Sequence, residues 1–288
     1  MDNKRIALEQ AVAANRQAWD QSARLHQESA SWQELTDGFS RPGYSVFDAT
    51  MTRTLEGLAL QGKSGVQIGC NNGRETLSLP AFGAQRCLGI DQSSEFLKQA
   101  ELLKEISGSD CSFLCSDIYA LPDGIRRDFD FAVITIGVLN WMPDLARFFR
   151  VAAGLLRPGG QLVIYETHPV LEMFDPESET PFVPAESYFR TEPFAEQWAI
   201  TYDGSAKQAA SPSYWYIHKM SDIITGMIHA GLAITSFEEH AHCNREEDYA
   251  IYESREPQLP MSFTLTAVRP GGEAGNPQGP RYGHRESR

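Results

Sequence analysis

The segment Val66-Gln67-Ile68-Gly69-Cys70-Asn71-Asn72-Gly73 decides the fold of this chain. Its first residues are typical of a buried strand, and the glycines and asparagines that follow predict a tight turn leading into a helix. Gly69 and Gly73 allow the backbone to approach a ligand closely, and Asn71 tolerates left-handed backbone geometry better than most residues. The segment therefore predicts a strand, a ligand-binding turn and a helix in succession.

Two further expected strands end next to acidic residues. The strand over 86–91 ends in Asp91, whose carboxylate is placed to accept hydrogen bonds from two ribose hydroxyls. The strand over 111–116 precedes Asp117 and Ile118, which together can hold an adenine, so three consecutive strand ends fit one nucleoside. The G-x-G-x-x-G pattern of a pyrophosphate site is absent, and the turn favours an uncharged or zwitterionic tail.

Around this segment, short apolar runs alternate with helical segments, which predicts βα units around a mostly parallel sheet. Strands are expected over 65–69, 86–91, 111–116, 129–136, 160–166, 234–238 and 261–268. Helices are expected up to about residue 32 and over 45–60, 74–79, 93–106, 144–156 and 221–229. Residues 168–217 break this rhythm and are rich in Pro, Phe, Tyr and Glu, so we expect an insertion that acts as a lid over a substrate region.

The pattern divides the chain into three parts. Residues 1–44 are expected to form an N-terminal helical cap, and residues 45–268 a Rossmann-like α/β domain that contains the insertion. Residues 269–288 are dominated by Gly, Pro and charge, which predicts a disordered tail.

Composition narrows the function classes. The 288 residues, 42% of them hydrophobic, suffice for a full core, and 38 acidic against 25 basic residues give a net charge of -13. No broad basic face is available, which argues against a nucleic acid partner.

No apolar run long enough to cross a membrane and no signal peptide is evident, so we expect a cytoplasmic protein. The five cysteines favour free, mostly buried thiols, and no metal site is predicted.

The sequence resembles the class I S-adenosylmethionine-dependent methyltransferases. The resemblance rests on residues 66–73 and on four other stretches: Gly89-Ile90-Asp91, Ser116-Asp117-Ile118, Phe129-Asp130-Phe131-Ala132-Val133 and Leu155-Leu156-Arg157-Pro158-Gly159-Gly160-Gln161-Leu162. It covers about residues 45–168 well and 219–268 loosely. It implies a seven-stranded sheet with an antiparallel last strand and helices on both faces.

The same resemblance implies S-adenosylmethionine as the cofactor. The turn would hold its methionyl part, Asp91 its ribose, and Asp117 with Ile118 its adenine. The expected cofactor-binding residues are Gly69, Cys70, Asn71, Gly73, Asp91, Gln92, Asp117, Ile118, Gly137 and Trp141. Gln67 and Asn71 depart from the family pattern, which usually has an acidic residue and a glycine at these positions. These departures leave room for a changed reaction.

Methyl transfer is an in-line displacement on an activated carbon, so the protein mainly supplies alignment and desolvation. Asn140, His168 and Tyr188 are the candidate catalytic or positioning residues. The candidate substrate-binding residues are Trp19, Tyr44 and Phe189. Each has a structural alternative, because Asn140 can belong to a helix-start turn, a single histidine is often structural, and aromatic residues often belong to the core.

Three functions are compatible with this pattern. The first is a methyltransferase that acts on a small molecule in specialised metabolism. The second resembles the azetidine-2-carboxylate synthases, in which the amine of S-adenosylmethionine attacks its own γ-carbon and expels methylthioadenosine. A dry aromatic enclosure would favour this cyclisation by lowering the pKa of the amine. The third is a cofactor-binding protein without catalysis.

Overall fold

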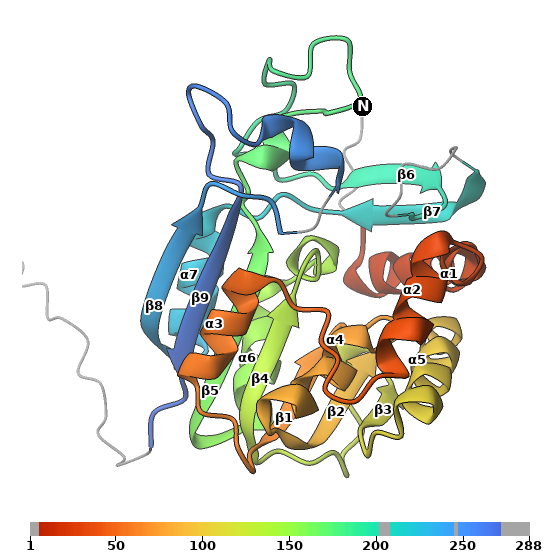
Figure 1. Cartoon of the computed structure of the whole chain (residues 1–288). Helices are drawn as coiled ribbons and strands as arrows, with labels where there is room; N and C mark the ends of the chain where they lie inside the picture. The colour runs from red at the N-terminus through yellow and green to blue at the C-terminus, as the bar shows by residue number, and fades with distance from the viewer. Residues whose placement is uncertain (1–5, 202–207, 245–246, 272–288) are drawn as a thin grey trace, which may run out of the picture.

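A computed structural model describes residues 6–201, 208–244 and 247–271. A seven-stranded sheet forms the centre of the molecule (Figure 1). Its strand order is β3-β2-β1-β4-β5-β9-β8. In chain order the strands are β1 (Ser64–Ile68), β2 (Gln85–Asp91), β3 (Ser112–Cys115), β4 (Phe129–Thr135), β5 (Leu156–Thr167), β8 (Ala233–His240) and β9 (Ser262–Val268). The first five pair in parallel and β9 is antiparallel to both of its neighbours, which confirms the expected sheet.

Helices cover both faces of this sheet. They are α1 (Leu8–Gln27), α2 (Ala30–Phe39), α3 (Ala49–Gly57), α4 (Arg74–Ser78), α5 (Ser94–Ser107), α6 (Leu145–Leu155) and α7 (Met220–His229). Short 3-10 turns lie at Leu79–Phe82, Ile118–Ala120, Leu139–Trp141, Leu171–Met173 and Glu247–Tyr252.

The alternation of side chains along β4 divides the core into two layers. Phe131 and Val133 pack in the cluster that includes residues of α2 and α3, whereas Ala132 and Ile134 pack in the cluster that includes residues of α6 and α7. A strand buried on both faces needs apolar residues at every position, and β4 from Phe131 to Ile134 supplies them.

The N-terminal segment forms two helices instead of the single helix expected up to about residue 32. The chain breaks at Ser29, which has extended backbone geometry immediately before α2. The Ser29 hydroxyl donates to the carbonyl oxygen of His26 at 2.7 Å. Serine favours the position before a helix because its side chain competes with helical backbone hydrogen bonds, and this competition ends α1 at Gln27.

The insertion contains a β-hairpin that its sequence pattern did not reveal. Strands β6 (Phe194–Trp198) and β7 (Ala209–Trp215) pair in an antiparallel two-stranded sheet that lies beside α1 and above the carboxyl ends of the central strands (Figure 1). Helix α1 is hydrogen-bonded to β7 through Asn15 and Gln21. We call α1 together with β6 and β7 the cap.

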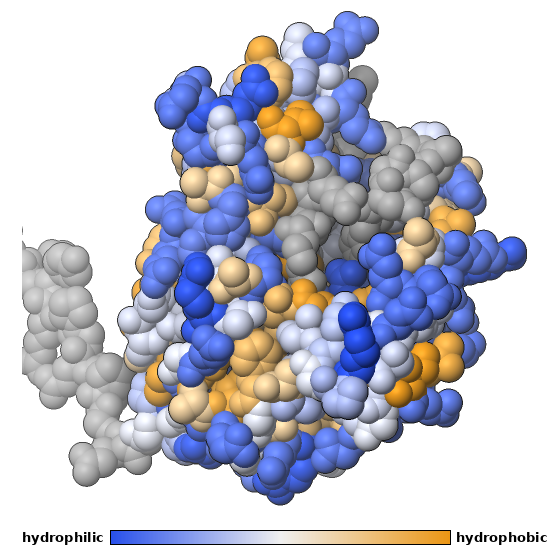
Figure 2. All heavy atoms as spheres, viewed as in Figure 1, coloured by the Kyte–Doolittle hydropathy of each residue, from blue (hydrophilic) through white to orange (hydrophobic). Residues whose placement is uncertain are grey.

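The start of the expected tail is attached to the domain. The backbone N–H of Arg269 donates to Gly160 at 2.8 Å, and Arg269 accepts from the N–H of Gly159 at 2.7 Å. Residues 272–288 lie outside the described residues. In the described ranges, every helix is too short or too polar to cross a membrane. The face seen in Figure 2 is mostly hydrophilic, with separate small hydrophobic patches.

Candidate active site

A cavity of about 510 Å³ lies between the cap and the carboxyl ends of the central strands. Its wall combines the residues after β1, β2, β3, β4 and β5 with side chains of α1, β6 and β7. Ligands of open parallel sheets bind at this edge because the strand order reverses there and leaves a crevice. The position therefore agrees with the site expected from the three strand ends.

The turn after β1 has the left-handed geometry that its composition predicts. The φ angles of Gly69, Asn71 and Gly73 are 70°, 49° and 74°. The N–H groups of Gly69 and Cys70 both donate to the carbonyl oxygen of Ile90, which attaches the turn to β2. A Cβ atom at Gly69 would lie 2.7 Å from the side chain of Val138, so the turn also packs closely against the loop after β4.

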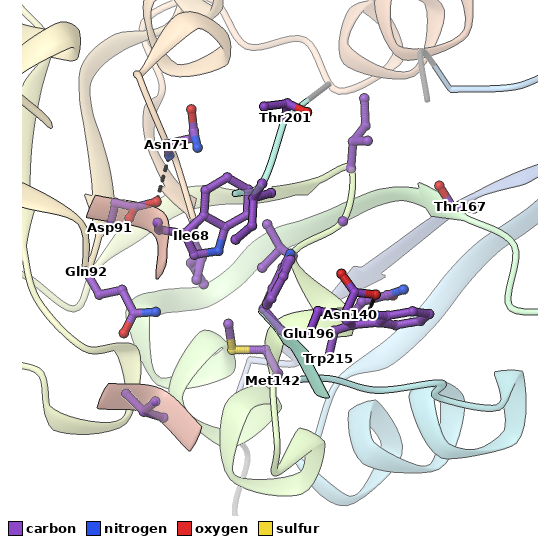
Figure 3. A pocket seen from close by; sticks show the side chains of 18 of the residues that line it. Ile68, Asn71, Asp91, Gln92, Asn140, Met142, Thr167, Glu196, Thr201 and Trp215 are labelled. Atoms are coloured by element: carbon purple, nitrogen blue, oxygen red, sulfur yellow. Dashed lines mark hydrogen bonds between the residues drawn. The ribbon is translucent and has the colours of Figure 1, made fainter. Parts of the chain in front are cut away.

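Asp91 connects this turn to the end of β2. Its carboxylate accepts from the N–H of Asn71 at 2.7 Å (Figure 3). It also accepts from the N–H of Ser93 at 2.9 Å. Burial raises the pKa of Asp91, and these two hydrogen bonds oppose that rise. Because a carboxylate has about four acceptor sites, Asp91 keeps capacity for hydroxyl donors in the cavity.

The end of β3 supplies a polar and an apolar group to the same cavity. Asp117 accepts from the N–H of Tyr119 at 2.8 Å, which starts the following 3-10 turn. Ile118 belongs to the core and also lines the cavity. The Asp117 side chain therefore has a structural role, which leaves part of its accepting capacity for a ligand.

Glu166, near the end of β5, determines the shape of the loop after β4. Its buried carboxylate accepts from the backbone N–H groups of Gly137 and Leu139. Sequence reasoning did not select Glu166, although an acidic residue at the end of an otherwise apolar strand was a visible signal. The loop that it holds carries six cavity residues, Ile136, Gly137, Val138, Asn140, Trp141 and Met142.

Asn140 participates in a polar cluster that joins three distant segments. Its side-chain amide donates to Glu172 at 2.8 Å, and the hydroxyl of Tyr249 donates to the other oxygen of Glu172 at 3.0 Å. The N–H of Tyr216 donates to the backbone carbonyl of Asn140 at 2.8 Å. Sequence reasoning missed Glu172 and Tyr249, because they follow Asn140 by about 30 and 110 residues in segments without periodic pattern.

Aromatic side chains form much of the remaining wall. The rings of Trp19 and Trp141 meet edge to face with centroids 5.2 Å apart, which joins α1 to the loop after β4. On the hairpin, the indole N–H of Trp215 donates to Glu196 at 2.8 Å, and the Trp215 ring stacks on Phe194. Edge-to-face and stacked aromatic pairs hold these walls at fixed positions.

Most of the residues expected at the site lie in this wall. Those that line the cavity are Trp19, Gly69, Asn71, Asp91, Gln92, Asp117, Ile118, Gly137, Asn140 and Trp141. Cys70 and Gly73 belong to the turn but not to the cavity lining. Cys70 is fully buried, and a Cβ atom at Gly73 would lie 2.6 Å from Phe113, so both serve the packing of the turn.

The other four expected residues lie outside the cavity lining. The ring of His168 is buried, with Nε2 3.0 Å from a Glu239 oxygen and Nδ1 accepting from the N–H of Val170 at 3.2 Å. Burial lowers the pKa of His168, and Glu239 opposes that shift. Both nitrogens therefore have partners within the fold, which agrees with the structural alternative for this histidine.

Tyr44, Tyr188 and Phe189 also lie outside the cavity lining. The hydroxyl of Tyr188 accepts from the N–H of Met220 at 2.9 Å, and the Tyr44 ring packs edge to face on Phe39. Phe189 is 73% exposed. The insertion lacks a periodic pattern, so the direction of its side chains was not predictable from sequence.

The side chain of Gln67, which departs from the family pattern, has hydrogen-bond partners inside the fold. The Gln67 side chain donates to Thr135 at 3.1 Å and accepts from Thr76 at 2.5 Å. It is buried and does not line the cavity.

All five cysteines are free, and among the described residues no group of three or more His, Cys, Asp or Glu side chains is placed to hold a metal ion.

Comparison with known proteins finds that part of the chain is similar to methyltransferases. Residues 66–164 match the family described as "Methyltransferase domain". A tRNA U34 carboxymethyltransferase of Shewanella loihica is 32% identical over 134 residues, which cover 45% of this chain and 37% of that protein. A ubiquinone biosynthesis O-methyltransferase of Xanthomonas euvesicatoria is 28% identical over 128 residues, which cover 44% and 53%. The chain thus matches only about a third to a half of these relatives.

A solved structure extends the likeness to most of the fold. The S-adenosylmethionine-dependent methyltransferase of Mesorhizobium loti superposes with a TM-score of 0.52 at 20% identity, over 77% of this chain and 98% of that one. At this identity the superposition establishes the fold alone.

Proposed function

We propose that this protein transfers the methyl group of S-adenosylmethionine to a small molecule enclosed beneath the cap, because residues 66–164 match the family described as "Methyltransferase domain" and the fold resembles that of a solved S-adenosylmethionine-dependent methyltransferase. The observation that carries the proposal is the hydrogen bond between Asn71 and Asp91 at the edge of the cavity. It holds the Asp91 carboxylate, which would accept from ribose hydroxyls, beside a turn of left-handed backbone. This arrangement supports the binding of a nucleoside with a zwitterionic tail.

The residues of this chain fit the cofactor along one side of the cavity. Asp91 would bind the ribose, and Asp117 with Ile118 would bind the adenine. The turn from Gly69 to Gly73 would hold the methionyl part through Gly69 and Asn71, which line the cavity. When bound, S-adenosylmethionine supplies a methyl carbon that its sulfonium already activates.

The protein then contributes alignment and exclusion of water. Glu166 holds the loop after β4 in place through two backbone N–H groups, and this loop presents Asn140 to the cavity. The aromatic walls of the cap exclude water from the reacting atoms, and an aromatic face near a sulfonium stabilises its charge. No strong base is required for a displacement of this kind.

The acceptor that we propose is a small molecule and not a nucleic acid. The cavity lies under the cap, and the chain carries a net charge of -13. A polyanion would be repelled both by the surface and by the carboxylates at the cavity. We therefore do not propose tRNA, which is named for one relative, as the acceptor of this protein.

The charge of the cavity also favours methyl transfer over cyclisation of S-adenosylmethionine. Cyclisation requires an uncharged amine as the attacking group. Neighbouring carboxylates favour the charged form of an amine and raise its pKa. Tyr188, one of the three candidate catalytic residues, lies outside the cavity lining.

The test is incubation of the purified protein with S-adenosylmethionine, first without an acceptor and then with pooled small metabolites, followed by mass spectrometry against a heat-inactivated control. Calorimetric titration with S-adenosylhomocysteine measures cofactor binding independently. We expect binding, an intact cofactor without acceptor, and S-adenosylhomocysteine together with a methylated product when the acceptor is present. Methylthioadenosine with a four-carbon cyclic amino acid in the first incubation would instead establish cyclisation. Absence of S-adenosylhomocysteine binding would overturn the proposal.

A further inference from the structure

The cavity has two chemically different sides (Figure 3). Asn71, Asp91 and Gln92 lie on one side of the view, and Asn140, Glu196 and Trp215 lie on the other. The first side comes from the ends of the central strands and fits the cofactor. The second side comes from the loop after β4, the insertion and the segment before β9, so it is the side on which an acceptor would lie.

Carboxylates are concentrated on the acceptor side. Five of them line the cavity there: Glu172, Asp175, Glu177, Glu196 and Asp248. Asp91 and Asp117 add two more on the cofactor side. Among the described lining residues there is no Lys, Arg or His. The described wall is therefore strongly acidic, and its potential attracts cations and repels anions.

Aromatic faces accompany these carboxylates. Trp198, Trp215 and Tyr249 line the same side of the cavity, with the Trp215 indole N–H bonded to Glu196 and the Tyr249 hydroxyl bonded to Glu172. These bonds use the polar edge of each side chain and fix the orientation of its ring. Aromatic rings next to carboxylates bind ammonium and other organic cations through both the ring face and the charge.

We infer that the acceptor of this protein is a small organic cation whose charged group is held on the acceptor side by Glu172, Glu196 and the aromatic rings beside them. The inference rests on the proposed function and specifies its substrate class. It excludes acceptors that carry phosphate or several carboxylates, because these would place like charges next to Glu172 and Glu196.

The positive group is the part of the acceptor that is recognised, and not the atom that receives the methyl group. Carboxylates raise the pKa of a nearby amine and keep it protonated, and a protonated amine has no lone pair with which to attack. The methyl group is therefore received by a second atom of the same molecule, an oxygen, a carbon or a more distant nitrogen.

Matched pairs of probes test this inference. Choline is compared with 3,3-dimethylbutan-1-ol, and benzylamine with benzyl alcohol, because the members of each pair have similar size and differ in charge. Ligand-observed NMR measures each affinity at pH 7.5 with the protein saturated by S-adenosylhomocysteine. We expect at least one cation to bind about tenfold more tightly than its neutral partner and to weaken as salt is added. Equal affinities within both pairs would overturn the inference.

Charge-removing variants locate the binding side. Glu172→Gln preserves an acceptor for Asn140, and Glu196→Gln preserves an acceptor for Trp215. Each should weaken cation binding about three- to tenfold and leave the neutral probe unchanged. Glu192→Gln, on an exposed residue of the same insertion outside the cavity lining, is the matched control and should change neither affinity.

Two further outcomes separate this inference from the proposed function. If the cation binds to the protein without S-adenosylhomocysteine but not to the saturated protein, the acidic side holds the amino group of the cofactor itself, and the acceptor inference fails while the proposed function stands. If S-adenosylhomocysteine does not bind and the cation does, the proposed function fails instead.

Discussion

Asn15 and Tyr214, which are 199 residues apart, exchange two hydrogen bonds. The Asn15 side chain donates to the carbonyl oxygen of Tyr214 at 2.8 Å and accepts from its N–H at 2.7 Å. A side-chain amide thus takes the place of a neighbouring strand at the edge of β7. Because Asn15 is only 1% exposed, this pair joins α1 and the hairpin into one cap over the cavity.

Replacing Asn15 should loosen the cap. Asn15→Leu keeps a similar volume but leaves the N–H and carbonyl groups of Tyr214 without partners, which costs about 1–3 kcal/mol. We expect a lower free energy of unfolding, faster hydrogen exchange of β7 and weaker S-adenosylhomocysteine binding. Gln33→Leu, at an exposed position of α2, is the control. It removes a side-chain amide whose hydrogen bond goes to the exposed Asp37. Equal hydrogen exchange of β7 in both variants would contradict the role of Asn15.

Asp91→Asn should impair cofactor binding more than folding. An asparagine oxygen can still accept one of the two backbone N–H bonds, but its amide cannot accept from ribose hydroxyls as a carboxylate does. The loss of charge-assisted hydrogen bonds predicts an affinity for S-adenosylhomocysteine that is about ten- to a hundredfold lower. Titration calorimetry and thermal unfolding measure the two effects separately. Asp123→Asn, on an exposed loop, should leave the affinity unchanged, and an unchanged affinity of Asp91→Asn would remove Asp91 from the cofactor site.

Alanine variants at two glycines with almost the same backbone geometry distinguish the effect of backbone strain from the effect of a steric clash. Gly69 and Gly62 have φ angles of 70° and 74°, so alanine at either costs about 1–2 kcal/mol. Only at Gly69 would the new Cβ atom meet a neighbour, the Val138 side chain at 2.7 Å, whereas nothing lies within 4 Å at Gly62. We expect both variants to lose stability, and Gly69→Ala alone to lose S-adenosylhomocysteine binding. Comparable binding by the two variants would mean that the turn does not contact the cofactor.

His218 should make the stability of the fold sensitive to acid. Its Nε2 lies 2.8 Å from the carbonyl oxygen of Met142, and burial lowers its pKa from 6.5 to about 4. Since the folded state binds the proton less readily than the unfolded state, this contribution is complete above about pH 6.5 and is lost as the pH falls toward 4. The expected loss between pH 7 and pH 5 is about 1–2 kcal/mol.

Urea unfolding at these two pH values measures that loss. His218→Gln keeps a donor near the position of Nε2 but does not titrate, so the stability of this variant should fall less between pH 7 and pH 5 than that of the wild type. His229→Gln, at the exposed end of α7, should retain the wild-type difference. An equal loss in wild type and His218→Gln would assign the acid sensitivity to other groups, including His168.

Local pattern made much of the fold predictable. Strand β4 has apolar residues at consecutive positions because helices cover both of its faces, and the same composition marks it in the sequence. The turn after β1 was predictable because only glycine and asparagine readily adopt its left-handed geometry. Asp91 and Asp117 could be found because Asp91 ends β2 and Asp117 lies just beyond the end of β3.

The insertion was less predictable for a physical reason. Its strand β7 bonds to side chains of α1, as in the pairing of Asn15 with Tyr214, and β6 pairs with β7 and not with the central sheet. Such a strand need not alternate apolar and polar residues, since the groups that it contacts are distant in sequence. For the same reason Tyr188 and Phe189 were expected at the site, whereas Trp198 and Trp215 line it.

The sequence by itself therefore determined the central sheet, the helices between its strands and the side of the cavity that is expected to bind a nucleoside. Each of these depends on residues within one strand and the turn that follows it. Only the tertiary structure decided the other side of the cavity. Glu172, Glu196 and Tyr249 line one wall because folding brings together three segments that are far apart in sequence. No spacing along the chain encodes that proximity, which arises from side-chain hydrogen bonds between segments that are far apart in sequence.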